Sequence, residues 1–87
     1  MDATLLVTLL AKPLMKEVLK EIVKTQAVLL KDLVNRIPQG KSEVTKALSE
    51  LKRAELIKER QAPLDDFNTY YVTAEGLQAH SRLRGLE

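Results

Sequence analysis

The chain has 87 residues, of which 45% are hydrophobic and 30% charged, and its formal net charge is +2. These values are typical of one folded domain, exclude a disordered segment, and permit nucleic-acid binding without requiring it. Because there is no cysteine, a disulfide framework, a thiolate zinc site and a cysteine nucleophile are excluded, and we expect a cytoplasmic protein. The longest uncharged apolar stretch, residues 3–11, is too short to cross a bilayer and lacks the basic lead-in of a signal peptide.

Two helices are predicted at the N-terminal end. Residues 3–11 should form the first, with Asp2 as its N-cap and one leucine-rich side made by Leu5, Leu6, Leu9 and Leu10. Pro13 then either kinks a long helix or opens a new one at its first turn, where the missing N–H costs nothing. Residues 13–24 follow with apolar side chains at i, i+3, i+4 and i+7, namely Met15, Val18, Leu19 and Ile22.

The middle of the chain predicts a short strand, a short helix and a tight turn. Residues 25–28 break the helical pattern and are the predicted strand. A third helix follows, and its apolar face is made by Leu30, Leu33, Val34 and Ile37. Pro38-Gln39-Gly40 ends this helix, because proline cannot continue a helix and glycine tolerates the turn.

Residues 42–54 form the most informative predicted helix. Its buried face is defined by apolar residues at helical spacing, Val44, Ala47, Leu48 and Leu51. Ser42 is the predicted N-cap, since its hydroxyl can accept a hydrogen bond from a free backbone N–H. The opposite face carries hydrogen-bond donors, which are Lys41, Thr45, Lys46, Ser49, Lys52 and Arg53. An ordinary amphipathic helix with a solvated face has the same pattern, so the neighbouring elements decide between the two interpretations.

A hairpin and a last helix are predicted after it. Residues 56–60 and the β-branched and aromatic run at 69–73 should pair antiparallel around the polar loop 61–68. Thr73 can cap a final helix. The side chains predicted to face inward from that helix are Leu77, Leu83 and, as a further candidate, His80.

A short helix, a tight turn and a donor-rich helix make up the layout of a helix-turn-helix, and the hairpin would be its wing. With this order of elements the chain resembles the MarR-type and related winged helix-turn-helix transcription regulators. The resemblance rests on residues 29–34 as support helix, residues 41–51 as recognition helix, Ala54-Glu55-Leu56-Ile57 as the turn into the wing, and residues 71–76 as the second wing strand with its threonine-x-x-glycine exit.

The resemblance covers roughly residues 13–80 and implies a mainly α fold with a small β-hairpin, a winged helix-turn-helix with an extra N-terminal helix. We therefore expect one winged-helix domain over residues 1–87, with residues 1–12 as an N-terminal helix for dimerisation and 13–80 as the core. Family members usually carry an aspartate-x-arginine in the wing, whose arginine reaches the minor groove, whereas this chain has Asp66-Phe67-Asn68. Glycine is also common where Glu55 stands.

The resemblance implies that the helix at 42–54 reads the major groove of double-stranded DNA, as a transcriptional regulator that recognises a specific sequence. The predicted DNA contacts are Lys41, Ser42, Thr45, Lys46, Ser49, Lys52, Lys58 and Arg60. Among them, the first two lysines can donate to guanine, the short hydroxyl side chains permit close approach, and the last three cations would contact phosphates. The alternative is a protein-interaction module that does not bind DNA, which the low net charge and the acidic Asp65 and Asp66 favour.

The N-terminal leucines need a partner, because they cannot all face one small core. We expect a symmetric homodimer whose interface residues are Leu5, Leu6, Leu9, Leu10 and Leu83. The alternative is that the first helix closes the core of the monomer. An enzyme is not expected, since the sole histidine is His80 and there is no cysteine, and neither a metal site nor a cofactor is predicted.

Overall fold

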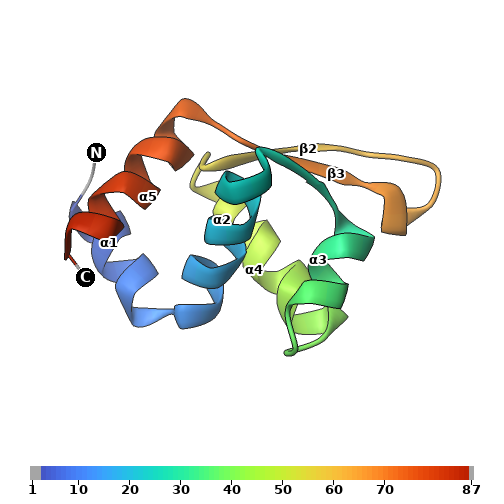
Figure 1. Ribbon diagram of the computed structural model, residues 1–87, viewed down its shortest axis with the longest axis horizontal. Helices are drawn as coiled ribbons and strands as arrows, with labels where there is room; N and C mark the ends of the chain where they lie inside the picture. The colour runs from blue at the N-terminus through green and yellow to red at the C-terminus, as the bar shows by residue number, and fades with distance from the viewer. Residues whose placement is uncertain (1–2, 87) are drawn as a thin grey trace.

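A computed structural model describes residues 3–86 of the chain (Figure 1). Within this range the elements are α1 (Ala3–Ala11), α2 (Pro13–Thr25), β1 (Ala27–Leu29), α3 (Leu30–Arg36), α4 (Lys41–Arg53), β2 (Ile57–Arg60), the 3₁₀ turn η1 (Asp65–Phe67), β3 (Thr69–Val72) and α5 (Ala74–Leu86). This mainly α architecture with a small antiparallel sheet confirms the predicted winged-helix fold. Asp2, the predicted cap of the first helix, lies outside the described residues.

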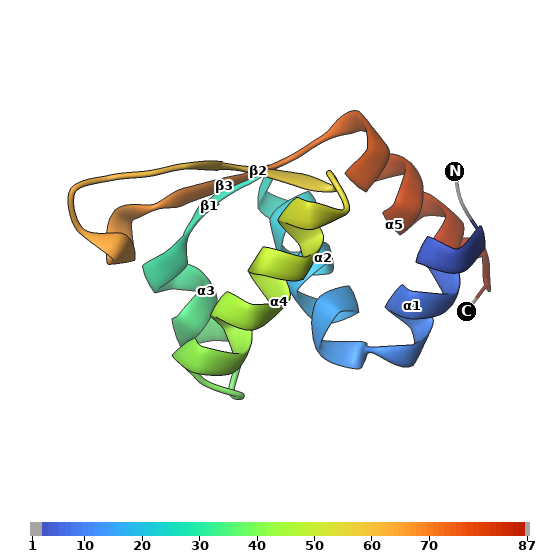
Figure 2. The same cartoon turned by 180° about the vertical axis from the view of Figure 1, so that it is seen from behind.

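The elements are spread along one long axis. In both Figure 1 and Figure 2, α1 and α5 lie at one end, the wing and α3 lie at the other, and α2 runs between them. Figure 2 shows α4 in front of α2, on the side that faces the viewer. The side chains on the face of α4 that points away from α2, such as Lys46 and Ser49, are exposed.

Pro13 opens a new helix and does not kink a long one. Lys12 alone separates α1 from α2, and Pro13 stands in the first turn of α2. The backbone N–H of Lys12 still donates to the carbonyls of Thr8 and Leu9, at 3.1 and 3.3 Å, so the sharp bend leaves this donor paired.

The sheet has the strand order β1-β3-β2, and both pairs are antiparallel. The predicted pairing of the two wing strands is confirmed, with Ile57 opposite Val72 and Arg60 opposite Thr69. β1 adds a third strand on the other side of β3, with Val28 opposite Tyr70.

The short strand predicted at 25–28 is displaced along the chain, because β1 begins at Ala27. The helix α2 persists through Thr25, whose hydroxyl donates to the carbonyl of Glu21 at 3.0 Å. Gln26 then adopts a left-handed φ of +66°, which turns the chain out of the helix and into the strand.

The two apolar stripes predicted from sequence meet in the core. They bury Met15, Val18, Leu19 and Ile22 from α2, and Val44, Ala47, Leu48 and Leu51 from α4. The sheet adds Val28, Ile57 and Tyr70 to the same cluster. Because burial of each large apolar side chain contributes roughly 1.5–3 kcal/mol, this cluster fixes which face of α4 remains exposed.

The prediction that Ser42 caps the recognition helix is wrong. The helix begins one residue earlier, at Lys41, with Gly40 as N-cap and no capping side chain. Gly40 has a φ of +93°, which glycine adopts without strain, and its carbonyl accepts the first helical hydrogen bond from Val44 at 3.1 Å. Ser42 therefore lies within the first turn, exposed, and its hydroxyl is not used for capping.

α4 ends in a Schellman motif. The N–H of Leu56 donates to the carbonyl of Leu51 at 3.1 Å, and the N–H of Glu55 donates to that of Lys52 at 3.0 Å. Glu55 occupies the left-handed position of the motif with a φ of +63°. This conformation is the physical reason why glycine suits the position, and this chain places a glutamate there instead.

The start of α5 matches the predicted cap, but its buried face differs from the prediction. Thr73 Oγ1 accepts a hydrogen bond from the N–H of Gly76 at 3.0 Å, as expected of an N-cap. Leu77 was predicted to face inward and is 49% exposed. Leu83 is buried as predicted, and His80 is only partly buried. Gly76 and Ala79 complete the buried face, because Gly76 sits against the carbonyl of Leu56 and so turns this face toward the core.

Candidate nucleic-acid interface

A stripe of four exposed polar residues runs along α4 directly opposite its buried face. These residues, spaced by four, three and four positions, are Ser42, Lys46, Ser49 and Arg53. Neither Lys46 nor Arg53 forms an ion pair within residues 3–86. The predicted contact set omitted Arg53, although its helical spacing from Lys46 and Ser49 was a signal that could have placed it there.

The other predicted cations of α4 lie on one flank and are held by the wing. The Nζ of Lys41 is 3.5 Å from Oδ1 of Asp66, and the Nζ of Lys52 is 2.9 Å from Oε1 of Glu59. Thr45, on the same flank, donates its hydroxyl to the carbonyl of Lys41 at 2.7 Å. Three of the predicted donors are thus already engaged inside the molecule.

The opposite flank of α4 is fastened to the α1–α2 junction. The Nζ of Lys12 lies 3.0 Å from Oε2 of Glu50, and both side chains are partly exposed. α4 is therefore bordered by ion pairs on both sides. Its cations that form no ion pair within residues 3–86, Lys46 and Arg53, both lie in the stripe between these flanks.

Glu59 links α4 to the wing. Besides Lys52, its carboxylate accepts a 2.6 Å hydrogen bond from the hydroxyl of Tyr70. The hydrogen bonds from Tyr70 and Lys52 lower the pKa of the Glu59 carboxyl. Burial, followed by the bond to this carboxylate, raises the pKa of the Tyr70 hydroxyl above its usual value. The wing strands and the end of α4 thus share one charged network.

The wing tip is tied to the support helix. Asn68 is buried; its backbone carbonyl accepts from the N–H of Leu30 at 2.8 Å, and its side-chain oxygen accepts from the N–H of Ala62 at 2.8 Å. The Nζ of Lys31 lies 6.0 Å from the centre of the Phe67 ring. The tip that lacks the arginine of the family is therefore anchored beside α3.

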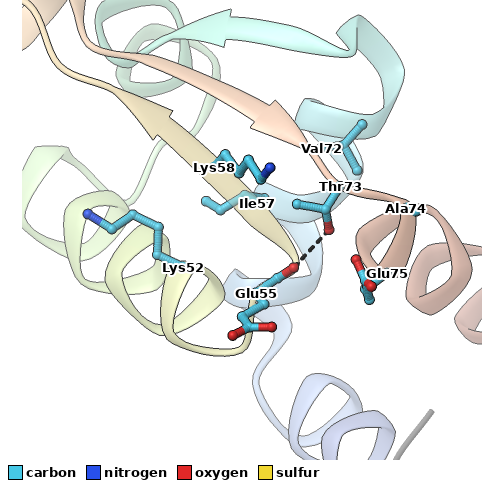
Figure 3. Close-up of a pocket in the computed structure, with 8 residues that line it drawn as sticks. All are labelled: Lys52, Glu55, Ile57, Lys58, Val72, Thr73, Ala74 and Glu75. Carbon is cyan, nitrogen blue, oxygen red and sulfur yellow. Dashed lines mark hydrogen bonds between the residues drawn. The ribbon is translucent and has the colours of Figure 1, made fainter.

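Two of the predicted DNA contacts lie apart from the others. Side chains alternate between the faces of a strand, so Lys58 and Arg60 lie on the opposite face of β2 from Glu59, which reaches α4. Figure 3 shows the ammonium groups of Lys52 and Lys58 pointing in opposite directions. Of the eight predicted contacts, six lie on α4 and two lie on the outer face of the sheet.

A shallow pocket of about 580 Å³ lies where α4, β2, β3 and α5 meet (Figure 3). Its walls carry Lys52 and Lys58, but also Glu55 and Glu75. The hydroxyl of Thr73 spans it by donating to the carbonyl of Glu55 at 2.8 Å. The mixed charges give this pocket no clear preference for an anion or a cation. Across residues 3–86 no cluster of acidic or histidine side chains could hold a metal ion, and no helix could span a membrane.

The predicted dimer residues have unequal exposure. Leu9 and Leu83 are fully buried in the core of the chain itself, so they are not available to a partner of the folded monomer. Leu5 and Leu6 are half-buried against the same core. The exposed large apolar side chains of α1 are Val7, at 64%, and Leu10, at 43%.

Neither a scan against protein-family models nor a search of curated proteins finds a match to this sequence. Solved structures do match it. YusO from Bacillus subtilis superposes with a TM-score of 0.76 at 20% identity, over 85% of this chain and 53% of that one. A mutant of E. coli MarR complexed with operator DNA superposes with a TM-score of 0.73 at 15% identity, over 83% and 52%. A possible transcriptional regulator for arsenical resistance gives a TM-score of 0.71 at 18% identity, over 93% and 81%.

The chain thus spans about half the length of YusO and of MarR, and most of the length of the arsenical-resistance regulator. At these identities the likeness concerns the fold alone. The chain has the winged-helix fold of the MarR-family transcription regulators.

Proposed function

We propose that this chain binds double-stranded DNA in a sequence-specific manner, as a cytoplasmic transcriptional regulator, with α4 in the major groove. The observation that carries the proposal is the uncommitted polar stripe of Ser42, Lys46, Ser49 and Arg53 on a helix whose other face is locked into the core. Short serines at two positions of the stripe permit close approach to base edges, and the two cations can donate to bases or phosphates. A structural neighbour solved with operator DNA supports this choice.

Lys46 is the side chain whose removal tests the proposal most directly. It is exposed, so Lys46→Ala removes no core contact. If Lys46 reads a guanine, the change should cost about 1–3 kcal/mol on the preferred sequence and relax specificity there. If it contacts only phosphate, binding should weaken evenly across sequences and the salt slope should fall by about one.

The experiment is fluorescence anisotropy on a pool of random duplexes and on the best sequence selected from it, at about 50 and about 200 mM salt. Lys24→Ala on α2 is the matched control, because it removes the same charge from an exposed position on another helix. Absence of duplex binding by the parent protein at the lower salt would refute the proposal. Equal losses in both variants would show that only overall charge matters.

We propose further that two copies associate through α1. Val7 and Leu10 are exposed on its outer side, and Leu6 is half-exposed beside them. A two-fold dimer would bury these residues and could place two α4 helices about 34 Å apart, one turn of DNA. Sedimentation of the parent and of Val7→Asp tests this, since that side chain makes little contact with the chain's own core; a parent that is monomeric at micromolar concentration contradicts it.

A protein-interaction module is the second candidate function. The observation that favours it is the acidic wing tip, where Asp65 and Asp66 are exposed and Lys41 is already paired with a carboxylate. The anisotropy experiment separates the two functions, because this one predicts no duplex binding even at low salt.

A further inference from the structure

The outer face of the three-stranded sheet is a basic surface separate from α4. Strand alternation and the observed register place six side chains on it, which are Ala27, Leu29, Lys58, Arg60, Thr69 and Tyr71. The intervening residues Val28, Ile57 and Tyr70 are buried on the inner face. Among these six side chains two are cations and none is a carboxylate, although Lys58 also borders the pocket that Glu55 and Glu75 line.

An aromatic ring lies beside the two cations. Tyr71 is on the central strand, directly opposite Lys58, and is 36% exposed. Arg60 lies on the same face two residues further along β2, at the diagonal position from Tyr71. Neither Lys58 nor Arg60 forms an ion pair in the part of the chain that the structure describes. The ring and both charged groups are thus available together to a ligand.

The outer face of the sheet is directed away from the duplex that α4 is proposed to bind. Glu59 leaves β2 on the inner side and reaches Lys52 on α4, so its neighbours Lys58 and Arg60 leave on the other side. The wing tip is fastened to α3 through Asn68. The two wing cations are therefore not arranged to extend the contacts of α4 along one duplex.

We propose that the outer face of the sheet is a second nucleic-acid surface, and that its occupant is single-stranded DNA. Lys58 and Arg60 bind consecutive phosphates while an unpaired base stacks on the ring of Tyr71, the combination of charge and aromatic platform that single-strand binding uses. In a duplex the bases are already stacked on one another and cannot cover the ring. An acidic peptide would use the two cations but gives the exposed ring no role. The proposal does not depend on α4 reading DNA.

The test measures anisotropy of a labelled thymidine oligonucleotide of about twelve nucleotides, beside a labelled duplex, at about 50 mM salt. We expect Tyr71→Ala to weaken single-strand binding by about fivefold or more, the lower end of what base stacking contributes. Lys58→Ala/Arg60→Ala should weaken it further, and Tyr71→Ala should leave duplex binding unchanged. Lys46→Ala should have the opposite pattern, weakening the duplex and leaving the single strand unchanged.

Lys20→Ala/Lys24→Ala is the matched control, since it removes two exposed charges from α2 without touching the sheet. An equal loss in this control would overturn the proposal, as would single-strand binding that does not depend on Tyr71. If Lys58→Ala/Arg60→Ala weakens the binding of duplex and single strand alike, the wing cations belong to the α4 interface. That result would refute the single-strand surface and leave the proposed duplex binding intact. Displacement of the oligonucleotide by a polyglutamate peptide at equal concentration would identify an acidic protein as the occupant, and tighter binding of a uridine oligonucleotide would identify RNA. Circular dichroism confirms that each variant is folded.

Discussion

Replacing Asp66 by asparagine should strengthen the binding of duplex DNA. Its Oδ1 lies 3.5 Å from the Nζ of Lys41, at the start of the recognition helix, and the two side chains are 61% and 56% exposed. A phosphate that binds this lysine would therefore compete with the Asp66 carboxylate. Bound DNA must therefore either displace Asp66 or do without Lys41, and Asp66→Asn removes that competition while keeping the shape of the side chain.

The size of the gain follows from the geometry. Two unit charges this far apart attract by about 1 kcal/mol in water, and exposed pairs retain about 0.2–1 kcal/mol after their entropy cost. Releasing Lys41 should therefore tighten DNA binding by about 1.4- to fivefold at about 50 mM salt. The gain should shrink at about 200 mM, because screening weakens both the internal pair and the phosphate contact.

The assay is the anisotropy titration at both salt concentrations. Glu17→Gln is the control, since it removes one negative charge from an exposed position on α2, away from the wing. Equal gains in Asp66→Asn and Glu17→Gln would show that only net charge matters. An unchanged or weaker affinity of Asp66→Asn at low salt would refute the reasoning that the wing competes with DNA for Lys41.

Three predictions concern the elements that position α4. Glu55→Gly should raise the free energy of unfolding by about 0.5–1 kcal/mol in urea titrations, because glycine tolerates the φ of +63° there and relieves strain that exceeds its entropy cost; a loss of stability would contradict the assignment of the Schellman motif. Glu59→Gln should lower stability at neutral pH, because the folded-state pKa of this carboxyl is depressed; the stabilisation is present above about pH 4.3 and disappears as the pH falls through the lower folded-state value, so parent and variant unfolding curves should converge in acid, and a constant difference at all pH values would exclude the charged network. Gly76→Ala should lower stability by about 1–3 kcal/mol in thermal unfolding, because a Cβ would collide with the carbonyl of Leu56, whereas Gly85→Ala in the same helix meets nothing within 4 Å and should be neutral or slightly stabilising; similar results for the two would mean that α5 does not pack as described.

The parts of the fold that could be predicted from sequence are the helices and strands whose apolar residues repeat at a regular spacing. The spacing of Val44, Ala47, Leu48 and Leu51 identified the buried face of α4, and the β-branched and aromatic run at Thr69–Val72 identified the central strand. Both signals are set by which side chains can be buried together in a helix or a strand, and the structure confirms both.

The errors occurred where a backbone conformation or a distant contact decides the outcome. Because Gly40 adopts a positive φ and serves as the N-cap, α4 begins one residue earlier than predicted and Ser42 has no capping role. Close packing of Gly76 on Leu56 rotated α5, so that Leu77 faces solvent. Neither effect appears in the spacing of apolar residues, because the first depends on the φ of a single glycine and the second on a contact with a residue twenty positions earlier.

The predicted DNA contacts show the same limit. Sequence spacing identifies the donors on the exposed side of α4, but it does not reveal which of them are paired. Lys41 and Lys52 are held by carboxylates of the wing, and these pairs form only when the hairpin folds back beside the helix. The separation of Lys58 and Arg60 from α4 depends on strand register, which is fixed by tertiary pairing.

This distribution of charge links the proposed DNA binding to the proposed dimer. α4 has ion pairs on both flanks. Each chain therefore offers Lys46 and Arg53 on the proposed reading helix as cations that have no ion-pair partner among residues 3–86. If both contact phosphate, one chain should give a salt slope of only about −2, and two chains on adjacent half-sites about −4. A single copy would then bind weakly at physiological salt, and useful affinity would come from joining two reading helices in one molecule. A measured slope near −2 that stays the same for Val7→Asp would show that one copy binds alone, and that the exposed apolar side of α1 serves another purpose.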